Sequence, residues 1–357
     1  MDFSLLIPTK NRPQLLLRLI SYYHSLSFRG KIFIGDSSDT DTSAYIAKSL
    51  TTYSDILDCR YYHLPGKFTS EVLNILAGEV STAYVGYVPD DDFLIPAGIE
   101  SCMKFLNNHP DYIAAHGIGV IISSWSGDPR EIESAGFYRQ PIVEEATATH
   151  RVNKHFEHYS VGLFSVHRTE VWREIHRKTP NSSEHPEFSD KGFNDELLQC
   201  GLSAVYGKMK QLDQLYLVRQ VHNTRNLLPT WFDWIVKENW HSSYIYFRNQ
   251  LAHALADKDG IPLAQAEGIV EHAFYRYLKQ TVEAHEISPS TLRKFARESP
   301  SLRSIWHVVR VLLGWMQPRR VTLESLLNPV SPYNKDFLPV YCAVTRATRQ
   351  GERSEGA

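Results

Sequence analysis

Three adjacent carboxylates at the end of a strand-like run are the first residues of this chain that could do chemistry. Asp90, Asp91 and Asp92 directly follow the apolar and aromatic run 83–89. Adjacent carboxylates repel one another, so a positive charge between them would stabilise them. Hard divalent cations take oxygen ligands, and carboxylates often share Mg²⁺ or Mn²⁺ with substrate phosphates. The pattern indicates a metal and diphosphate site, or else a solvated acidic turn that caps a helix expected from Pro96.

The elements that must position these carboxylates alternate between strands and helices. Short runs rich in apolar and β-branched residues predict strands, and apolar residues at helical spacing predict helices between them. Strands are expected at 3–7, 31–35, 60–64 and 83–88, and helices at 13–23, 45–50 and 71–80. This alternation predicts an α/β fold with a Rossmann-like, mostly parallel sheet flanked by helices.

Polar residues stand at the ends of these strands, where open α/β sheets bind their ligands. Thr9 follows the first strand, Asp36 the second and residues 90–92 the fourth. Each alone is an ordinary turn former, but three polar groups at corresponding ends are more informative than one. The chain has neither a G-x-G-x-x-G loop nor a G-x-x-x-x-G-K-[ST] loop, which argues against dinucleotide and P-loop nucleotide sites.

The rest of the chain continues this alternation and then changes to helices. We expect a polar, irregular segment at 132–153 that forms a mobile loop over the site. The other expected elements are a helix at 96–107, a strand at 113–123, a strand at 161–167, a helix at 168–177, strands at 204–209 and 215–218, and helices at 231–257, 263–285, 289–297 and 302–316. The resulting division is an α/β domain over 1–228, a helical C-terminal region over 229–345 and a disordered tail over 346–357.

Composition places the chain among ordinary globular proteins. Of its 357 residues 43% are hydrophobic, and a net charge of −2 gives no sign of nucleic-acid binding. The four cysteines, Cys59, Cys102, Cys200 and Cys342, lie far apart, which favours free thiols in a reducing compartment. Neither a signal peptide nor an apolar run long enough to cross a bilayer is evident, so a cytoplasmic protein is expected.

Five short stretches form a pattern that is more specific together than singly. They are Leu6-Ile7-Pro8-Thr9-Lys10-Asn11-Arg12, Ile34-Gly35-Asp36-Ser37-Ser38, residues 88–96, Asn194-Asp195-Glu196-Leu197 and Arg219-Gln220-Val221-His222-Asn223. In this order they resemble the family 2 glycosyltransferases with the GT-A fold. The resemblance implies metal-dependent, inverting transfer from a UDP- or GDP-linked sugar to a glycan, lipid-linked or protein acceptor, in surface glycan or glycoconjugate synthesis. The Q-x-x-R-W motif of similar processive polysaccharide synthases is absent, which favours transfer of a single sugar.

The resemblance also implies roles for individual residues. The implied donor-binding residues are Pro8, Thr9, Arg12, Asp36, Lys67, Asp90 and Asp91. Among them, Asp36 would bind the base and Asp90 the ribose, although Pro89 stands where the family often has a further Asp. Mn²⁺ or Mg²⁺ would be held by Asp91 or Asp92, with His222 completing the metal or diphosphate site. Alignment on Pro96 favours Asp91, whereas strand alternation places Asp90 and Asp92 on one side.

Sugar transfer needs such residues for its own chemical reasons. A metal neutralises the charge of the leaving diphosphate. A carboxylate that takes the proton of the acceptor hydroxyl accelerates the reaction by ~10²–10⁴-fold. The resemblance assigns this base to Asp195, with Glu196 as the competitor, although each is otherwise an ordinary acid of a first helical turn. Two other classes stay open: a nucleotidyltransferase of similar fold and a non-catalytic nucleotide- or sugar-binding protein.

A stretch near the C-terminus combines apolar residues with arginines. Residues 302–316 are rich in Ile, Val, Leu and Trp, and Arg319 and Arg320 follow. Such a helix can lie flat on a membrane, which would bring the enzyme to a lipid-linked acceptor at the inner face of the membrane. The alternative is packing on the catalytic domain or on another subunit of a homo-oligomer, because a buried helix needs the same residues.

Overall fold

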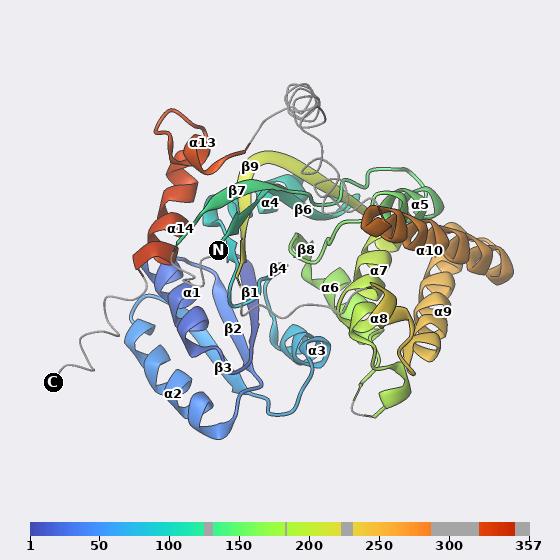
Figure 1. Cartoon of the computed structure of the whole chain (residues 1–357), viewed down its shortest axis with the longest axis horizontal. Coiled ribbons are helices and arrows are strands. Elements are labelled where there is room, and N and C mark those ends of the chain that lie inside the picture. Colours follow the sequence, from blue (N-terminus) through green and yellow to red (C-terminus); the bar gives the residue numbers. More distant parts are fainter. Residues whose placement is uncertain (125–130, 183, 223–230, 287–320, 347–357) are drawn as a thin grey trace, which may run out of the picture.

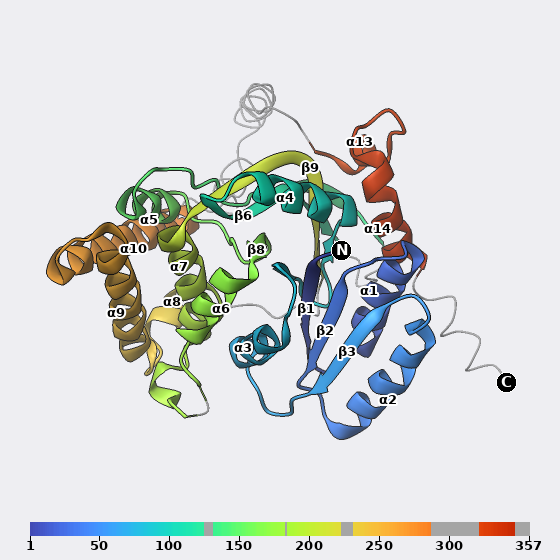
Figure 2. The ribbon, with the colours of Figure 1, turned by 180° about the vertical axis from the view of Figure 1, so that it is seen from behind.

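One mixed sheet forms the framework of the protein. The computed structural model describes residues 1–124, 131–182, 184–222, 231–286 and 321–346, and within these ranges the sheet has nine strands. Four parallel strands run in the order β3-β2-β1-β4 (Figures 1 and 2); they are β1 (Phe3–Thr9), β2 (Lys31–Asp36), β3 (Asp58–His63) and β4 (Tyr84–Tyr87). The register pairs Thr9 with Asp36, so the ends of β1 and β2 lie side by side, as the sequence predicts.

Five further strands extend the sheet beyond β4. They are β8 (Val166–Arg168), β6 (Tyr112–Ser123), β9 (Lys208–Val221) and β5 (Phe93–Leu94), with β7 (Ser134–Tyr138) paired to β6. β9 runs parallel to β6 and antiparallel to β5, where Phe93 faces Val218. This short pairing brings the residues that follow Val218 beside the acids that precede Phe93. The predicted α/β class, a mostly parallel sheet flanked by helices, is confirmed.

Helices cover both faces of this sheet, and side-chain alternation along the strands decides which core each face joins. Leu5 and Ile7 of β1 join the core that includes α1, whereas Leu6 joins the core that includes α3. The helices here are α1 (Pro13–Ser25), α2 (Thr40–Leu50), α3 (Thr69–Glu79), α4 (Pro96–Asn108) and α6 (Thr169–Arg177), with the 3₁₀ turns η1 (Thr51–Tyr53) and η2 (Pro186–Phe188). Prolines at the first helical positions begin α1 and α4, as expected from the sequence.

A second hydrophobic core lies at the opposite end of the molecule from α1 and α2 (Figure 1). Its helices are α5 (Ala148–Glu157), α7 (Leu198–Tyr206), α8 (Trp231–Ile235), α9 (Trp240–Asp259) and α10 (Leu263–Glu286). Phe156, Phe247 and Phe274 are buried between them. The helices expected at 231–257 and 263–285 are confirmed, with a break between α8 and α9.

The last described helices pack elsewhere. α14 (Asn334–Arg346) lies against α1 and β9, where Phe337 is fully buried and Gln214 Nε2 donates to Asp336 at 2.6 Å. α13 (Leu323–Leu327) packs against α14 and β7. The region 229–345 therefore contacts the sheet core at one end and the second core at the other. The helices expected at 289–297 and 302–316, the arginines of the expected membrane contact and nearly all of the tail lie outside the described residues. No helix within the described ranges is both long and apolar enough to span a bilayer.

The segment 132–153, expected to be a mobile loop, forms a strand and the start of a helix at 134–138 and 148–153, so that expectation was wrong there, while 139–147 has neither helix nor strand. β7 pairs antiparallel with β6, and α5 begins at Ala148. Charged residues make the segment look polar in the sequence, but one of them, Arg151 of α5, is only 3% exposed. Its guanidinium donates to the carbonyl oxygens of Ala204 and Val205, each at 2.8 Å. A buried polar residue that finds such partners is invisible to a hydropathy pattern.

Two expected strands also differ from the structure. Residues 204–206 end α7, and β9 then continues from Lys208 to Val221 through the predicted gap. The strand expected at 161–167 is reduced to β8. Helix and strand are hard to distinguish in short apolar runs, because both bury the same residue types.

We expect Gly98→Ala to loosen the contact between α4 and β9. A Cβ at Gly98 would lie 2.6 Å from the Leu215 carbonyl oxygen and 2.9 Å from Tyr216 Cα, so the helix must shift. Overpacking of this kind costs about 1–3 kcal/mol. The matched control is Gly78→Ala in α3, where a Cβ meets nothing within 4 Å. The control should gain up to about 1 kcal/mol. Chemical denaturation measures both, and equal free energies of unfolding would contradict the tight packing of α4.

Candidate active site

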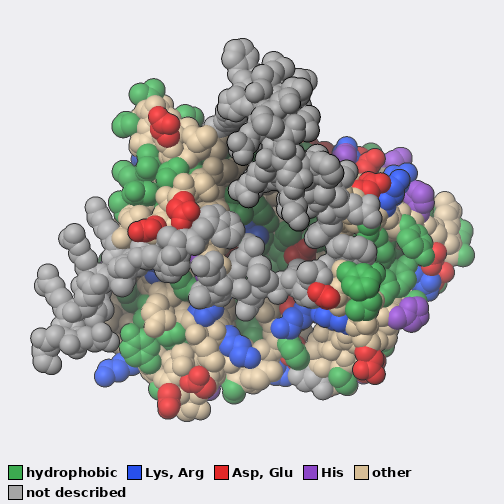
Figure 3. All heavy atoms as spheres, viewed as in Figure 1, with side chains coloured by type: hydrophobic (Ala, Val, Ile, Leu, Met, Phe, Trp, Pro, Cys, Tyr) green, Lys and Arg blue, Asp and Glu red, His purple; other side chains and the backbone are tan. Residues whose placement is uncertain are grey.

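A cleft of about 550 Å³ opens where β1 and β4 end. Its walls come from the turn after β1, the acidic loop after β4, the start of α3, the turn before α7 and the end of β9. Figure 3 shows a hollow near the middle of this face, with acidic and basic side chains inside it. The predicted site residues in its lining are Pro8, Thr9, Arg12, Lys67, Asp90, Asp91, Asp195 and Glu196. Asp36, Asp92 and His222 lie behind the lining.

Asp90 is buried between the turn after β1 and the start of α1. Thr9 Oγ1 donates to Asp90 Oδ2 at 2.7 Å, and an Arg12 nitrogen lies 2.9 Å from Oδ1. Burial raises the pKa of Asp90 to about 7, because it outweighs the opposing effects of Arg12 and Thr9. The first acid of the triplet therefore fastens the loop after β4 to the residues that follow β1.

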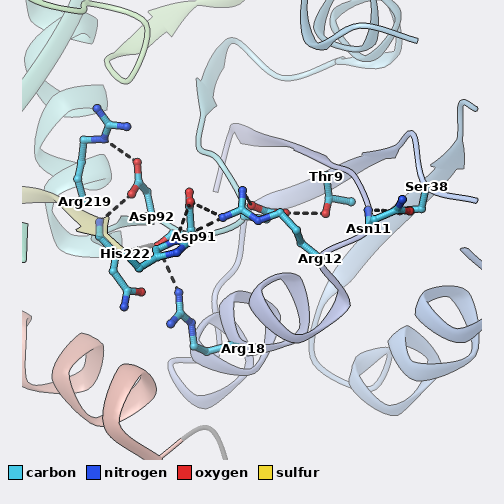
Figure 4. Close-up of polar contacts among 11 residues, drawn as sticks. Thr9, Asn11, Arg12, Arg18, Ser38, Asp91, Asp92, Arg219 and His222 are labelled. Atoms are coloured by element: carbon cyan, nitrogen blue, oxygen red, sulfur yellow. Dashed lines mark hydrogen bonds and ion pairs between the residues drawn. The ribbon is translucent and has the colours of Figure 1, made fainter. Parts of the chain in front are cut away.

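Asp91 is held between Arg12 and His222 (Figure 4). Its Oδ2 lies 2.5 Å from an Arg12 nitrogen and 3.1 Å from His222 Nε2, and Arg18 donates to its backbone carbonyl at 3.3 Å. Burial raises the pKa of Asp91, but the hydrogen bond with His222 and the charge of Arg12 outweigh burial and lower it to about 2. Asp91 is thus ionised at neutral pH and lies at the wall of the cleft.

Asp92 is turned toward β9. Its Oδ2 accepts a hydrogen bond from Arg219 Nε at 2.7 Å, and its Oδ1 accepts one from the Gln220 backbone N at 2.9 Å. Burial raises the pKa of Asp92 to about 6 against the opposing charge of Arg219. The Arg219 guanidinium also lies 4.6 Å from the Phe164 ring centroid and 5.0 Å from that of Tyr138. Asp92 and Arg219 therefore form a fixed pair, and Arg219 faces the cleft.

Asp36 is fully buried, and both of its carboxylate oxygens accept hydrogen bonds. The Tyr61 hydroxyl donates to Oδ2 at 2.6 Å, and the Ser38 backbone N donates to Oδ1 at 2.8 Å. The Ser38 hydroxyl in turn accepts from the Asn11 backbone N at 2.7 Å (Figure 4), and Asn11 has a left-handed φ of 54°. Asp36 thereby supports the turn after β1, while its neighbour Ser37 lines the cleft.

Asp195 and Glu196 lie on η3 (Phe193–Leu197), a single π-helical turn that leads into α7. Asp195 Oδ1 accepts a hydrogen bond from the Ser70 backbone N at 3.2 Å, and Glu196 Oε1 accepts one from the Tyr159 hydroxyl at 2.9 Å. Burial raises the pKa of both carboxyls, which makes each a stronger base. π-Helical turns occur frequently at functional sites. The structure thus presents both candidate bases to the cleft.

The sequence pattern does not assign Arg219, Lys191 or Tyr159 to the site. Only general features of the sequence point to Arg219. A buried carboxylate requires a partner cation, and Arg219 belongs to one of the five motif stretches described above. Lys191 lines the cleft and is four residues before Asp195. Tyr159 carries no sequence signal, because its contact with Glu196 arises only from tertiary packing.

The described residues do not by themselves form a metal site. In the described ranges, no group of three or more His, Cys, Asp or Glu side chains gathers closely enough to hold a metal ion. Asp91 and His222 bring two such side chains together. An ion at this place would need further oxygen ligands from a bound substrate and water, which Mg²⁺ commonly uses.

Comparison with solved structures identifies the fold. S. aureus TarS, residues 1–349, matches with a TM-score of 0.51 at 15% identity, over 98% of this chain and 92% of that chain. The same part of TarS in complex with UDP-GlcNAc matches with a TM-score of 0.50 at 13% identity, over 98% and 92%. Against a longer TarS chain the match covers 78% of this chain and 43% of TarS. A search of curated proteins by sequence gives no match.

The fold is the GT-A fold of glycosyltransferase structures such as TarS, with a cleft at the strand ends. Residues 4–174, a little under half of the chain, match the family model described as glycosyl transferase family 2. This segment contains Thr9, Arg12 and the acidic triplet, and it forms the family 2 domain of the chain. The predicted resemblance and the predicted enzyme class are confirmed, and the glycosyltransferase is the correct choice among the three classes considered.

The buried Asp90 predicts that stability falls as pH rises. Its pKa is raised from the ordinary value of 3.8 to about 7 in the folded protein. Between these values the folded protein keeps a proton that the unfolded chain releases, so folding is favoured at the lower pH. Asp90→Asn should flatten the curve of unfolding free energy between about pH 4 and 7. The exposed Asp257→Asn should leave the curve unchanged. A slope for D90N as steep as that of the wild type would contradict the raised pKa.

Proposed function

We propose that this protein is a metal-dependent, inverting glycosyltransferase that moves one sugar from a nucleotide-sugar to an acceptor hydroxyl. The observation that carries the proposal is a single cleft with Arg12 and Asp91 on one wall and Asp195 and Glu196 on another. A leaving diphosphate needs positive charge and an acceptor hydroxyl needs a base, and this cleft offers both. TarS, which shares the fold, is known in complex with UDP-GlcNAc and with UDP, which supports a nucleotide-linked donor.

The nucleotide of the donor would lie at the end of β1. Pro8, Thr9 and Arg12 would surround it, Asp90 would contact the ribose and Lys67 the phosphates. Asp36, expected to bind the base, is fully buried and outside the cleft lining, so it would act through the turn that it supports by its bonds with Ser38 and Tyr61. The cationic side chains in the lining suit a diphosphate, and they are Lys10, Arg12, Lys67, Lys191 and Arg219.

Asp91 and His222 would hold Mn²⁺ or Mg²⁺ together with the donor diphosphate. Their nearest side-chain atoms are 3.1 Å apart. Two adjacent ligands at the ~2.1 Å of an octahedral Mg²⁺ site are ~3.0 Å apart, so the pair fits such an ion. When bound, the metal would neutralise charge on the leaving diphosphate. Asp92, the other candidate ligand, has both carboxylate oxygens bonded to β9 and does not line the cleft, whereas Asp91 does, which favours Asp91.

Asp195 would be the catalytic base, with Glu196 as the alternative. In the proposed step the acceptor oxygen attacks the anomeric carbon, its proton passes to the carboxylate, and the bond to the diphosphate oxygen breaks. A single displacement of this kind inverts the anomeric configuration. The acceptor would be a glycan, a lipid-linked glycan or a protein, in the synthesis of surface glycans or glycoconjugates.

Binding of a nucleoside diphosphate should depend on a divalent metal. Calorimetry with UDP and with GDP should show tighter binding in Mn²⁺ than in EDTA, and Asp91→Ala should remove the metal-dependent part. Asp257→Ala, which changes an exposed aspartate on α9, is the control and should bind as the wild type does. Equal binding in EDTA and in Mn²⁺ would sink the metal assignment.

Replacing the base should abolish transfer without preventing donor binding. Asp195→Asn keeps the size of the side chain but removes its basicity, so kcat should fall by at least ~10²-fold while the donor Kd stays nearly constant. Glu196→Gln is the matched comparison on the same turn. If E196Q is inactive and D195N retains activity, the base is Glu196 instead.

A further inference from the structure

A buried aspartate lies directly under the turn that carries the two candidate bases. The Asp190 side chain is 0% exposed and does not line the cleft. Its Oδ1 accepts hydrogen bonds from the Phe193 backbone N at 3.2 Å and from Trp234 Nε1 at 2.7 Å. Its backbone carbonyl accepts one from the Asn194 backbone N at 3.0 Å. Asp190 thus holds the first residues of η3, immediately before Asp195.

Trp234 belongs to α8, which is far from η3 in the sequence. Besides its hydrogen bond to Asp190, its indole ring lies 5.1 Å from the Phe193 ring. Gly192 leaves room for this ring, since a Cβ there would come 2.7 Å from Trp234 Nε1. Lys237 of the following turn reaches Asp190 Oδ2 at 3.4 Å. α8 is therefore fitted closely against the turn that carries the bases.

Trp240 also packs against Phe193 and can be compared directly with Trp234. Its ring lies 5.6 Å from the Phe193 ring, on the other side of the break between α8 and α9. Its indole nitrogen is buried and has no hydrogen-bond partner among the described residues. The two tryptophans thus share the contact with Phe193 and differ in the hydrogen bond to Asp190.

We propose that Trp234 and Asp190 are positioning residues that set the place of the catalytic carboxylate. Their hydrogen bond fixes the start of η3, and through it the distance from Asp195 and Glu196 to the donor side of the cleft. The inference rests on the proposed function, because it assumes that the base lies on this turn.

The test compares Trp234→Phe with Trp240→Phe. Both remove the same volume beside Phe193, but only W234F removes a hydrogen bond. W234F should lower kcat by about 10- to 100-fold, because a base displaced by about 1 Å loses that much rate. The donor KM should stay nearly unchanged. Hydrogen–deuterium exchange of residues 190–197 should become faster in W234F, and W240F should show neither effect.

Other results decide against the proposal. Equal losses of kcat in W234F and W240F would mean that the cluster acts only through packing, and an unchanged W234F would overturn the proposal outright. If the wild type transfers no sugar, the proposed function fails and the exchange experiment decides alone. In that case, faster exchange in W234F alone would still support the contact between Trp234 and η3. Equal exchange in both variants would rule that contact out.

A second variant covers the case in which W234F does not fold. Gly192 has φ −61° and ψ −41°, which alanine also adopts, and the added Cβ would lie 2.7 Å from Trp234 Nε1 and 3.1 Å from Asp190 Oδ1, so Gly192→Ala should disturb their hydrogen bond. It should reproduce the loss of kcat and the faster exchange. Gly268→Ala on α10, where a Cβ meets nothing within 4 Å, is the control. A Gly192→Ala variant as active as Gly268→Ala would overturn the proposal.

Discussion

The burial of three neighbouring carboxylates is the constraint on which the rest of this structure depends. Asp90, Asp91 and Asp92 are only 2%, 7% and 1% exposed. A buried charge without a partner is strongly destabilising, so each carboxylate must meet a cation or a donor. Arg12 at the start of α1 and Arg219 at the end of β9 are those cations. The loop after β4 therefore ties the first helix to the last strand, and this junction forms one wall of the cleft.

The donor-binding residues and the candidate bases of the proposed reaction are supported by different hydrophobic cores. The donor side follows β1 and β4, whose side chains pack beneath α1 and α3. The base side belongs to the second core, because Phe193 and Leu197 of η3 are buried among α5, α7, α9 and α10. The Ser70 backbone N, which donates to Asp195, is one direct contact between them. The distance between donor and base thus depends on how two cores meet.

The positive charge beside the triplet illustrates how far sequence reasoning reaches. Three adjacent acids at a strand end correctly indicated a site that needs positive charge, and the sequence suggested a metal ion. In the structure Arg12 and Arg219 already supply much of that charge. Arg219 is 127 residues from Asp92, so no local pattern could pair them. Separation along the sequence also explains why Tyr159 was not predicted beside Glu196. It likewise explains why α5 was predicted as a loop, since the carbonyl groups that Arg151 binds belong to a distant helix.

The sequence by itself determined the α/β class, the strand ends that carry polar residues and the family, because all three depend on periodicity and on short motifs. Pro13 and Pro96 begin their helices as local chemistry dictates. Only the tertiary structure decided which acids of the triplet face the cleft: Asp90 and Asp91 line it and Asp92 does not. Asp91 and Asp92 are chemically identical neighbours, but the fold places Arg12 and His222 against Asp91, and Arg219 and the Gln220 backbone N against Asp92. Contacts between distant segments form only when the sheet closes, so nothing within either segment specifies them.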